Sequence, residues 1–462
     1  MKLNNRIEEM RSEIIQATKS LIRIKSVEEK AKPNMPFGEG VAKALEEALK
    51  LSKNIGFNVK NLDGYVGYAE YGGGDDYIAV LGHLDVVPAG NGWTYSPYGG
   101  EVHGGKLYGR GAKDDKGPLI AALYGLKVIK DLNLPISKRI RIIFGTNEET
   151  NTKDIPYYLD RERPPTAGFT PDAYYPAVYA EKGIITFDIV KNIKENQSTG
   201  TKILNIKGGQ RANVVPDYCE VLLQTQDANS LIKIVKAYSL KTRYEIEAMK
   251  ENGNILVKSY GISAPGSLVV PGQNAIMQLF TFLDTLDLEN KEMKEYISFL
   301  NQYIGMETKG ESFGIYCKDE TGELSFNVGT IDMNNNCIRI TLNIRYPVTF
   351  ELEHIMESFH HRIEGSCIGI ENFKHKKPLY FPKDSSLVET LMKVYKEQTG
   401  IEAEPLSIGG GTYAKAMPNI IAFGPTFPGK TIVAHKPDEY IEIEDLILNA
   451  KIYAHAIYEL AK

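Results

Sequence analysis

Four short polar segments of the sequence carry side chains that can bind metal ions or transfer protons. They are residues 82–85, 109–117, 146–149 and 170–172, and each contains a histidine or a carboxylate. A mixture of imidazole and carboxylate ligands suits Zn²⁺, Mn²⁺ or Co²⁺ better than Mg²⁺ or Ca²⁺. The residue types therefore indicate metal-assisted chemistry, provided that the fold brings the four segments together.

Taken singly, the residues of the first two segments have ordinary structural explanations. A lone histidine such as His83 is more often structural than a metal ligand, although Asp85 two residues later is well placed to orient its ring. Asp114 and Asp115 precede an expected helix, where acidic residues commonly stabilise the helix dipole. Neither segment alone establishes a metal site.

The last two segments are equally open when each is considered alone. Glu148 and Glu149 are adjacent, so in an extended segment their side chains point in opposite directions. One of them would then bind a metal while the other faces a bound water, but a solvated acidic turn is the simpler explanation. Asp172 follows a proline and can simply begin a turn.

Together the segments make a stronger case than each does alone. Burying carboxylates together without a positive charge nearby costs several kcal/mol of stability for each one, or else the carboxylates become protonated. Two divalent cations would balance three carboxylates and a hydroxide, as in hydrolytic sites whose metals lie about 3.5–4 Å apart. We therefore predict two divalent metal ions, with Zn²⁺ as the first choice and Mn²⁺ or Co²⁺ as alternatives.

The elements around these segments predict an α/β fold. Residues 77–81 and 140–144 are short apolar runs typical of buried strands, and residues 118–131 between them have a helical pattern. Strands that alternate with helices indicate a mainly parallel, helix-flanked sheet, whose strand-end loops are the usual places for sites. A further helix is expected near the N-terminus, where apolar residues recur every three or four positions; they are Ile7, Met10, Ile14, Ala17 and Leu21.

The middle of the chain has a different pattern. Alternating strands such as 184–190, 218–225 and 338–345 indicate an α+β domain with an antiparallel sheet. The α/β pattern then returns with an expected helix, strand and helix over 386–398, 420–423 and 443–460. We therefore expect a catalytic, metal-binding domain formed by residues 1–183 and 376–462. It is interrupted by an inserted lid domain, residues 184–375.

Composition limits the class of protein. The chain has 462 residues, of which 42% are hydrophobic and 24% charged, and its net charge of −5 argues against a nucleic-acid-binding protein. We find neither an apolar stretch that would span a membrane nor a signal peptide, so a cytoplasmic protein is expected. None of the four cysteines forms a C-x-x-C pair, which favours buried free thiols in a reducing compartment.

A set of motifs in a fixed order extends over nearly the whole chain. The motifs are G-H-L-D-V-V-P at 82–88, L-Y-G-R-G-x-x-D-D-K-G-P at 107–118, E-E at 148–149, T-P-D at 170–172, N-x-V-P-D at 213–217, N-I-R-Y-P at 343–347, G-G-G-T-Y-A at 409–414 and H-K-P at 435–437. By these motifs the sequence resembles the M20 family of metallopeptidases, and in particular its bacterial PepV-type dipeptidases. As a set in this order, they are highly specific.

The resemblance implies a ligand set for two metal ions. His83, Asp114 and Asp172 would hold one ion. Asp114, Glu149 and His435 would hold the other, so that Asp114 bridges the two. The implied fold is the same interrupted α/β architecture that the strand and helix patterns predict.

The resemblance also implies residues that act on the substrate. Glu148 would be the general base, and Asp85 would be the hydrogen-bond partner of His83. Asn213 and Arg345 of the lid would meet the substrate's carboxylate or scissile region, and a planar guanidinium suits a carboxylate well. The turn lining the substrate would be formed by Gly410, Gly411 and Thr412.

One position departs from the family pattern. The family's lid carries a histidine in the stretch G-x-S-A-H, which helps to polarise the substrate carbonyl, and here Pro265 stands in its place. Proline has no side-chain donor, and the loss of one such donor typically costs about 10²–10³ in turnover. Tyr174 is a milder departure, because an acidic residue is more usual there.

The sequence therefore supports a metal-dependent hydrolase that cleaves the amide bond of dipeptides. Two alternatives stay open: an amidohydrolase of N-acylated amino acids, and a metal- and peptide-binding homologue whose catalysis is impaired by Pro265. The expected partner is a small peptide substrate, with no nucleic acid and no membrane. A monomer is expected, since the enlarged lid would let one chain complete the site.

Overall fold

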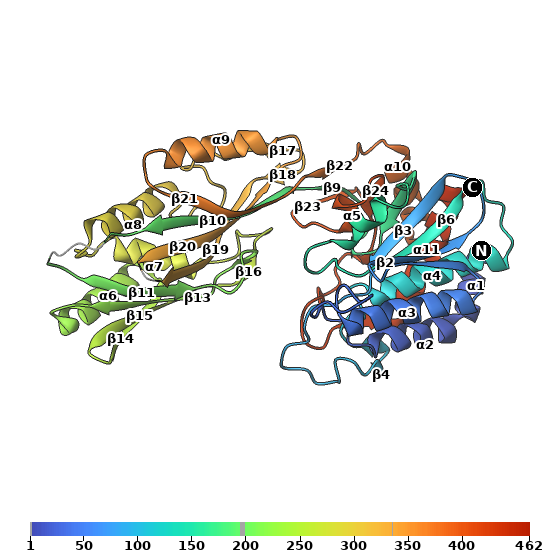
Figure 1. Ribbon diagram of the computed structural model, residues 1–462, viewed down its shortest axis with the longest axis horizontal. Helices are drawn as coiled ribbons and strands as arrows, with labels where there is room; N and C mark the ends of the chain where they lie inside the picture. The colour runs from blue at the N-terminus through green and yellow to red at the C-terminus, as the bar shows by residue number, and fades with distance from the viewer. Residues whose placement is uncertain (1, 195–198, 335) are drawn as a thin grey trace. The chain divides into compact units, whose positions relative to one another are not determined.

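The computed structural model describes residues 2–194, 199–334 and 336–462, and it divides the chain into two compact units (Figure 1). The first unit comprises Met1–Tyr179, Tyr380–Leu406 and Gly411–Lys462, and the inserted unit comprises Ala180–Leu379 and Ser407–Gly410. The sequence-based borders, after residues 183 and 375, each differ from this division by four residues. The short return of 407–410 to the inserted unit was not expected.

The first unit is built on a nine-stranded mixed sheet with the order β1-β2-β6-β3-β7-β24-β9-β22, in which β23 also pairs with β9. Its strands are β1 Asn58–Leu62, β2 Val66–Tyr71, β3 Tyr77–His83, β6 Arg139–Gly145, β7 Ala167–Thr170, β9 Val178–Glu181, β22 Leu379–Tyr380, β23 Leu406–Ile408 and β24 Ile420–Ala422. The central pairs β6–β3, β3–β7 and β7–β24 are parallel, whereas β1–β2, β2–β6 and β24–β9 are antiparallel. The predicted α/β class is confirmed, with the parallel strands at the centre.

Helices enclose the central strands of this sheet. All seven residues of β3 are buried, as expected for a strand covered on both faces. Two helices that contact β3, α4 Lys116–Asp131 and α11 Ile443–Ala461, also pack against each other at Gly125. A Cβ atom at Gly125 would lie 2.9 Å from the backbone nitrogen of Ala454, so only glycine permits this approach. The helix α5 Asp154–Leu159 contacts β2, and the remaining α-helices of the unit are α1 Lys2–Glu9, α2 Arg11–Ile22, α3 Glu39–Asn54 and α10 Ser386–Thr399.

The expected N-terminal helix is present but divided. The five residues of its apolar stripe are all buried, as predicted. The helix is interrupted at Met10, which separates α1 from α2. The stripe therefore predicts the buried face, and the break lies within it.

Two small strand pairs bring late segments of the chain beside early ones. The strand β26 Tyr440–Glu442 pairs with β5 Lys106–Tyr108, which also pairs with β4 Glu101–His103. The strand β25 Pro425–Thr426 pairs with β8 Ala173–Tyr174. As a result, the C-terminal segment runs next to two of the polar segments, 109–117 and 170–172.

The inserted unit is an antiparallel sheet with helices, as the predicted α+β class requires. Its strand order is β14-β15-β13-β11-β19-β20-β10-β21, and the burial of β13 and β15 alternates, so that one face of the sheet lies in the core. The strands are β10 Gly183–Asn192, β11 Lys202–Gly208, β13 Tyr218–Gln224, β14 Glu245–Glu251, β15 Asn254–Tyr260, β19 Ser325–Asn334, β20 Cys337–Tyr346 and β21 Gly369–Lys376. The helices are α6 Ala228–Thr242, α7 Ala275–Leu283, α8 Lys291–Tyr303 and α9 Leu352–Ile363. Two short antiparallel pairs join β12 Val214–Val215 to β16 Ala264–Pro265 and β17 Lys318–Asp319 to β18 Gly322–Glu323.

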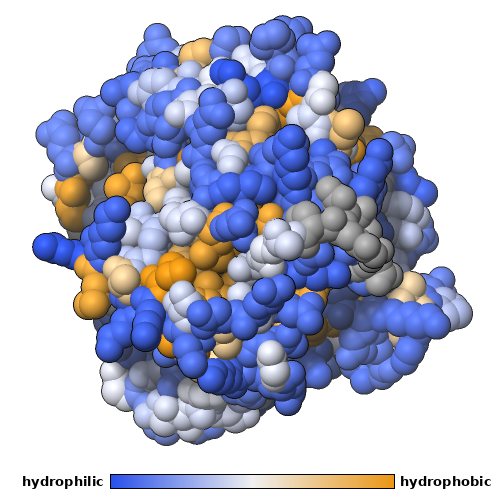
Figure 2. Space-filling view, turned by 90° about the vertical axis from the view of Figure 1, so that its left-hand side faces the viewer, coloured by the Kyte–Doolittle hydropathy of each residue, from blue (hydrophilic) through white to orange (hydrophobic). Residues whose placement is uncertain are grey.

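On one face of the inserted unit, hydrophilic residues surround a smaller hydrophobic area (Figure 2). Among the described residues, no helix combines the length and the apolar character that crossing a membrane would require. All four cysteines are free thiols, as predicted. Their predicted burial holds for Cys219 and Cys317 but is wrong for Cys337, which is half-buried, and for Cys367, which is exposed.

Candidate metal centre

The central parallel strands end at one edge of the sheet, and the polar segments meet there. His83 is the last residue of β3, Gly145 ends β6, and Thr170 ends β7. Because the carboxyl ends of parallel strands lie at the same edge, the loops that follow them converge. The 109–117 segment joins this edge through Asp115, whose carboxylate accepts the backbone N–H of His83 at 3.3 Å.

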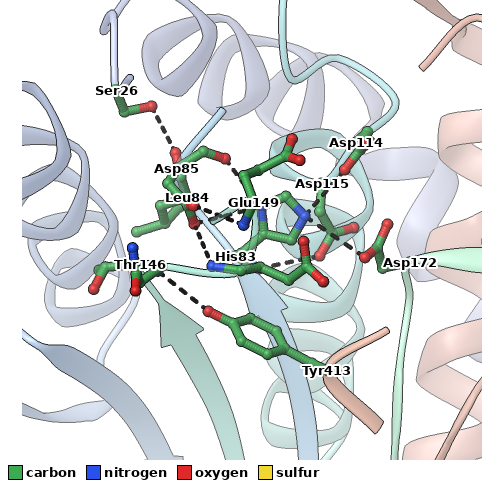
Figure 3. Close-up of polar contacts among 12 residues, drawn as sticks. Ser26, His83, Leu84, Asp85, Asp114, Asp115, Thr146, Glu149, Asp172 and Tyr413 are labelled. Atoms are coloured by element: carbon green, nitrogen blue, oxygen red, sulfur yellow. Dashed lines mark hydrogen bonds and ion pairs between the residues drawn. The ribbon is translucent and has the colours of Figure 1, made fainter. Parts of the chain in front are cut away.

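The imidazole of His83 is oriented as a metal ligand would be. Its Nδ1 lies 2.9 Å from the backbone oxygen of Asp85, which can only accept, so Nδ1 donates a proton there and Nε2 is the ring nitrogen left to bind a metal. Nε2 lies 3.0 Å from Asp114 Oδ1 and 3.6 Å from Asp172 Oδ2, and both carboxylates point towards the ring (Figure 3). This buried nitrogen makes no hydrogen bond of acceptable geometry to any described residue. A cation among these oxygens would fit its lone pair.

Asp114 lies between two histidines. While its Oδ1 faces His83, its Oδ2 lies 3.1 Å from Nε2 of His435, which in turn lies 3.0 Å from Glu149 Oε2. One carboxylate oxygen therefore faces each histidine, which is the arrangement of a carboxylate shared by two ions. All five predicted ligands are brought together at this place.

Among the described residues, two sets of three have possible ligand atoms within 4.8 Å of one another. They are His83, Asp114 and Glu149, and His83, Glu148 and Asp172. The second set includes the predicted general base. Glu148 therefore lies near enough to the centre for either a base or a ligand.

The ionisation of the cluster reflects its crowded acidic groups. Burial raises the pKa of Glu148 well above its ordinary value and that of Asp172 to about 7. Burial by itself would raise the pKa of Asp114 and lower that of both histidines, because it disfavours their charged forms. The contacts of Asp114 with His83 and His435 nevertheless hold its pKa well below normal, and the carboxylates raise the pKa of His435 to about 11 and that of His83 well above its ordinary value. Positive charge would therefore stabilise these crowded carboxylates, and the set of imidazole and carboxylate donors fits two divalent cations.

Asp85 organises the Glu148–Glu149 turn. Its carboxylate accepts the backbone N–H groups of Glu148 at 3.2 Å and Glu149 at 3.1 Å, whereas it stands 3.6 Å from the ring nitrogen of His83. Its burial raises its pKa to about 7. Residues 148–150 form a turn, which is the simpler of the two explanations that the sequence leaves open, and not an extended segment. This turn lets both glutamates lie near the centre rather than on opposite sides.

Further buried groups that the sequence reasoning did not single out support the same loops. Asp154 Oδ2 accepts the backbone N–H groups of Thr146 at 2.7 Å and Asn147 at 3.1 Å, and it also accepts the hydroxyl of Tyr413. The Tyr413 ring meets the His83 ring edge-on at 6.0 Å. In the sequence, Asp154 is an ordinary helix-start residue and Tyr413 belongs to the motif G-G-G-T-Y-A, whose glycines and threonine are expected to line the substrate. Neither position therefore indicates that it supports the loop at 146–149.

The comparisons with known proteins agree with this centre. The sequence model of Peptidase family M20/M25/M40 matches residues 79–459. The chain belongs to this family. It is a hydrolytic enzyme of the peptidase class, and the family resemblance seen in the motifs is confirmed.

Relatives of this M20 enzyme match it over nearly its full length. A Bacillus subtilis protein named "Putative dipeptidase YtjP" is 42% identical over 457 residues, covering 98% of each chain. A Staphylococcus haemolyticus relative with the same designation is 35% identical over 462 residues, again covering 98% of each chain. The two alignments therefore cover almost the whole of each chain.

Solved structures share the fold of this M20 enzyme. Human carnosine dipeptidase 1 superposes with a TM-score of 0.59 at 16% identity, covering 99% of this chain and 98% of the other. The di-peptidase Dug1p of Saccharomyces cerevisiae gives a TM-score of 0.59 at 14% identity, with the same coverage of both chains. At such low identity the likeness concerns the fold alone.

Two predicted substrate residues of the M20 enzyme gather in the inserted unit. Arg345 is buried; its Nε donates to Asn343 Oδ1 at 3.2 Å and its Nη1 to the backbone oxygen of Gly409. Asn213 and Asn343 both lie next to Gly266, because a Cβ atom on that glycine would lie 3.1 Å from Asn343 Oδ1 and from the backbone oxygen of Asn213. The side chain of Asn213 is exposed. Burial lowers the pKa of Arg345 to about 10, and no carboxylate among the described residues forms an ion pair with it.

The glycine-rich segment is divided between the units. Gly410 belongs to the inserted unit, whereas Gly411 and Thr412 belong to the first. Thr412 Oγ1 accepts the backbone N–H of Ala414 at 3.1 Å and so begins the short 3₁₀ helix η1, Tyr413–Lys415. Substrate binding by these three residues stays a prediction.

Pro265 lies on the edge of the inserted unit's short strand pair. It is exposed on β16, where its register partner is Val214 of β12, next to Asn213. The neighbouring Gly266 donates its N–H to the backbone oxygen of Asn213 at 2.7 Å. The side chain at position 265 therefore belongs to the same part of the unit as the predicted substrate residues.

Proposed function

We propose that this M20 enzyme is a dinuclear metallodipeptidase that hydrolyses the amide bond of dipeptides. The observation that carries the proposal is the Asp114 carboxylate, which turns one oxygen to His83 and the other to His435. A single structural ion would not need a shared carboxylate with a further glutamate beside it. The dipeptidase names of the relatives support the substrate class.

The ligands follow from the same contacts. His83, Asp114 and Asp172 would hold one ion, and Asp114, Glu149 and His435 the other. We propose Zn²⁺, with Mn²⁺ and Co²⁺ as the alternatives for this donor set. When bound, two such ions lower the pKa of water and polarise the amide carbonyl.

The protein's own groups then move the protons. Glu148 takes a proton from the attacking water as its oxygen bonds to the carbonyl carbon, and gives it to the amide nitrogen as the C–N bond breaks. Ligand atoms of Glu148, His83 and Asp172 lie within 4.8 Å of one another, so the Glu148 carboxylate is within reach of a water held at the centre. Asp85 keeps this base in place by holding the turn on its backbone.

The deciding experiment is turnover of a dipeptide panel by enzyme loaded separately with Mn²⁺, Zn²⁺ and Co²⁺, read by mass spectrometry. We expect cleavage to free amino acids, which stops when a chelator removes the metal and returns when metal is added back. Cleavage of N-acylated amino acids instead of dipeptides would favour the amidohydrolase. Dipeptide binding without cleavage under every metal would favour the second candidate, a binding homologue, for which Pro265 is the specific observation.

Arg345 supplies a second expected result. Its buried guanidinium, with no carboxylate partner among the described residues, is suited to a substrate carboxylate. Arg345→Ala should raise KM for dipeptides with a free carboxylate by about 10- to 100-fold, since a charged hydrogen bond contributes about 1.5–3 kcal/mol. Steady-state kinetics on free and C-terminally amidated dipeptides measures this.

The matched control lies on the same strand. Arg339 of β20 is paired with Asp188 and Glu371 at the surface, so Arg339→Ala should leave KM unchanged. Equal losses for free and amidated substrates in Arg345→Ala would show that the arginine does not recognise the carboxylate.

A further inference from the structure

A fully buried glutamate near the C-terminus lies within the loop that carries Asp114. Oε1 of Glu439 accepts three backbone N–H groups of this loop: Gly111 at 3.1 Å, Lys113 at 2.9 Å and Asp114 at 3.2 Å. The third of these is the backbone nitrogen of the shared carboxylate residue itself. One oxygen atom thus fixes the path of the loop through the residue between the two histidines.

The second carboxylate oxygen and the backbone oxygen of Glu439 bind the same loop. Its Oε2 accepts a hydrogen bond from Nη1 of Arg110 at 2.6 Å, and both side chains are almost completely buried. Its backbone oxygen accepts the N–H of Gly109 at 2.9 Å. The Arg110 guanidinium is itself held over the ring of Trp93 at 5.3 Å. The loop is therefore bonded to Glu439 from its first residue to Asp114.

The position of Glu439 in the chain joins the two sides of the centre. It follows His435 by four residues and directly precedes β26, which pairs with β5 just before the loop. The segment that supplies the second histidine thus also supplies the acceptor for the Asp114 loop. The 3.1 Å approach of His435 to Asp114 depends on both segments keeping this relation.

We propose that Glu439 is a positioning residue that sets the enzyme's affinity for its metal ions by holding Asp114 between the two histidines. This rests on the proposed two-metal function. A buried carboxylate lowers stability unless it is well hydrogen-bonded, and the hydrogen bonds of Glu439 go to the loop that carries Asp114. Partners that orient metal ligands typically change metal affinity by about 10- to 100-fold when replaced.

The test is a Co²⁺ titration of the full-length apo-enzyme by calorimetry, with the visible spectrum of Co²⁺ as a second readout of coordination. Glu439→Gln has the same shape, but its amide nitrogen cannot accept a hydrogen bond from Arg110 or the loop. We expect Co²⁺ to bind this variant about 10- to 100-fold more weakly, with an altered spectrum. Glu439→Asp keeps the charge on a shorter side chain and should show a smaller loss; it decides the matter if the glutamine variant does not fold.

The control separates positioning from general stability. Glu70 accepts a hydrogen bond from Nε of Arg141 at 2.5 Å, joining β2 to β6 in the same unit. Glu70→Gln should lower thermal stability and leave Co²⁺ affinity unchanged. Folded Glu439 variants that bind Co²⁺ like the wild type would overturn the inference, whereas a wild type that binds no Co²⁺ would overturn the two-metal function itself.

Discussion

Replacing Glu148 with alanine is expected to lower kcat by about 10²- to 10⁴-fold while both metal ions stay bound, because a positioned general base contributes this much. Glu148 is half-buried, and its carboxylate lies beside the centre without belonging to either proposed ligand set. Dipeptide turnover at saturating substrate measures the loss, and metal analysis of the same sample measures the ions.

The rival role for Glu148 is that of a ligand. A carboxylate oxygen of Glu148 lies within 4.8 Å of ligand atoms of His83 and Asp172. If Glu148→Ala retains only one metal ion, the assignment as base is wrong. Glu149→Ala is the matched variant from the same turn, and it should lose metal, since Glu149 stands 3.0 Å from His435.

The sequence predicts those parts of the centre that depend on neighbouring strands. His83 comes just after the apolar run 77–81, which lies in β3. Because β3 pairs in parallel with β7, the segment after β7 that carries Asp172 reaches the same edge of the sheet. The ligand set implied by the family resemblance is then joined by distances of 3.0–3.6 Å between its histidine nitrogens and carboxylate oxygens. The donor types alone are enough to indicate a divalent cation.

The sequence does not predict groups that act through bonds between distant segments. Glu439 lies 325 residues from Asp114, and Tyr413 lies 259 residues from Asp154, so no local pattern connects them. The sequence offers the Glu148–Glu149 turn only as a solvated one, and it gives no sign that the Asp85 carboxylate, which follows a different strand, holds this turn. Periodicity reports a local preference, whereas these loops adopt the conformation that buried acceptors impose.

Some expectations concern properties that no contact within the chain decides. The identity of the metal depends on coordination and supply, because one donor set accepts Zn²⁺, Mn²⁺ and Co²⁺. The cytoplasmic location and the monomeric state stay predictions. The departure at Pro265 is different, since its chemistry can be tested directly.

Replacing Pro265 with histidine is expected to raise kcat for dipeptides by about 10²- to 10³-fold, which is the usual contribution of one donor that stabilises a developing oxyanion. The position is open to the change, because Pro265 is exposed and its carbonyl, which accepts the N–H of Leu268 at 2.9 Å, is a backbone group that a histidine keeps. The new imidazole would stand on β16 opposite Val214, beside Asn213. Initial rates at saturating dipeptide measure the gain, with KM expected to change much less.

Leu268→His is the matched control, because it adds an imidazole to the same exposed stretch three residues away and should leave kcat unchanged. An equal gain in both variants would point to a general effect of added histidines, such as metal capture. If Pro265→His leaves kcat at the wild-type value while the wild type is already a fast dipeptidase, another group polarises the carbonyl. The expected gain arises only if the proline removes a donor that nothing else replaces, so the size of the change measures what this chain lost at that position.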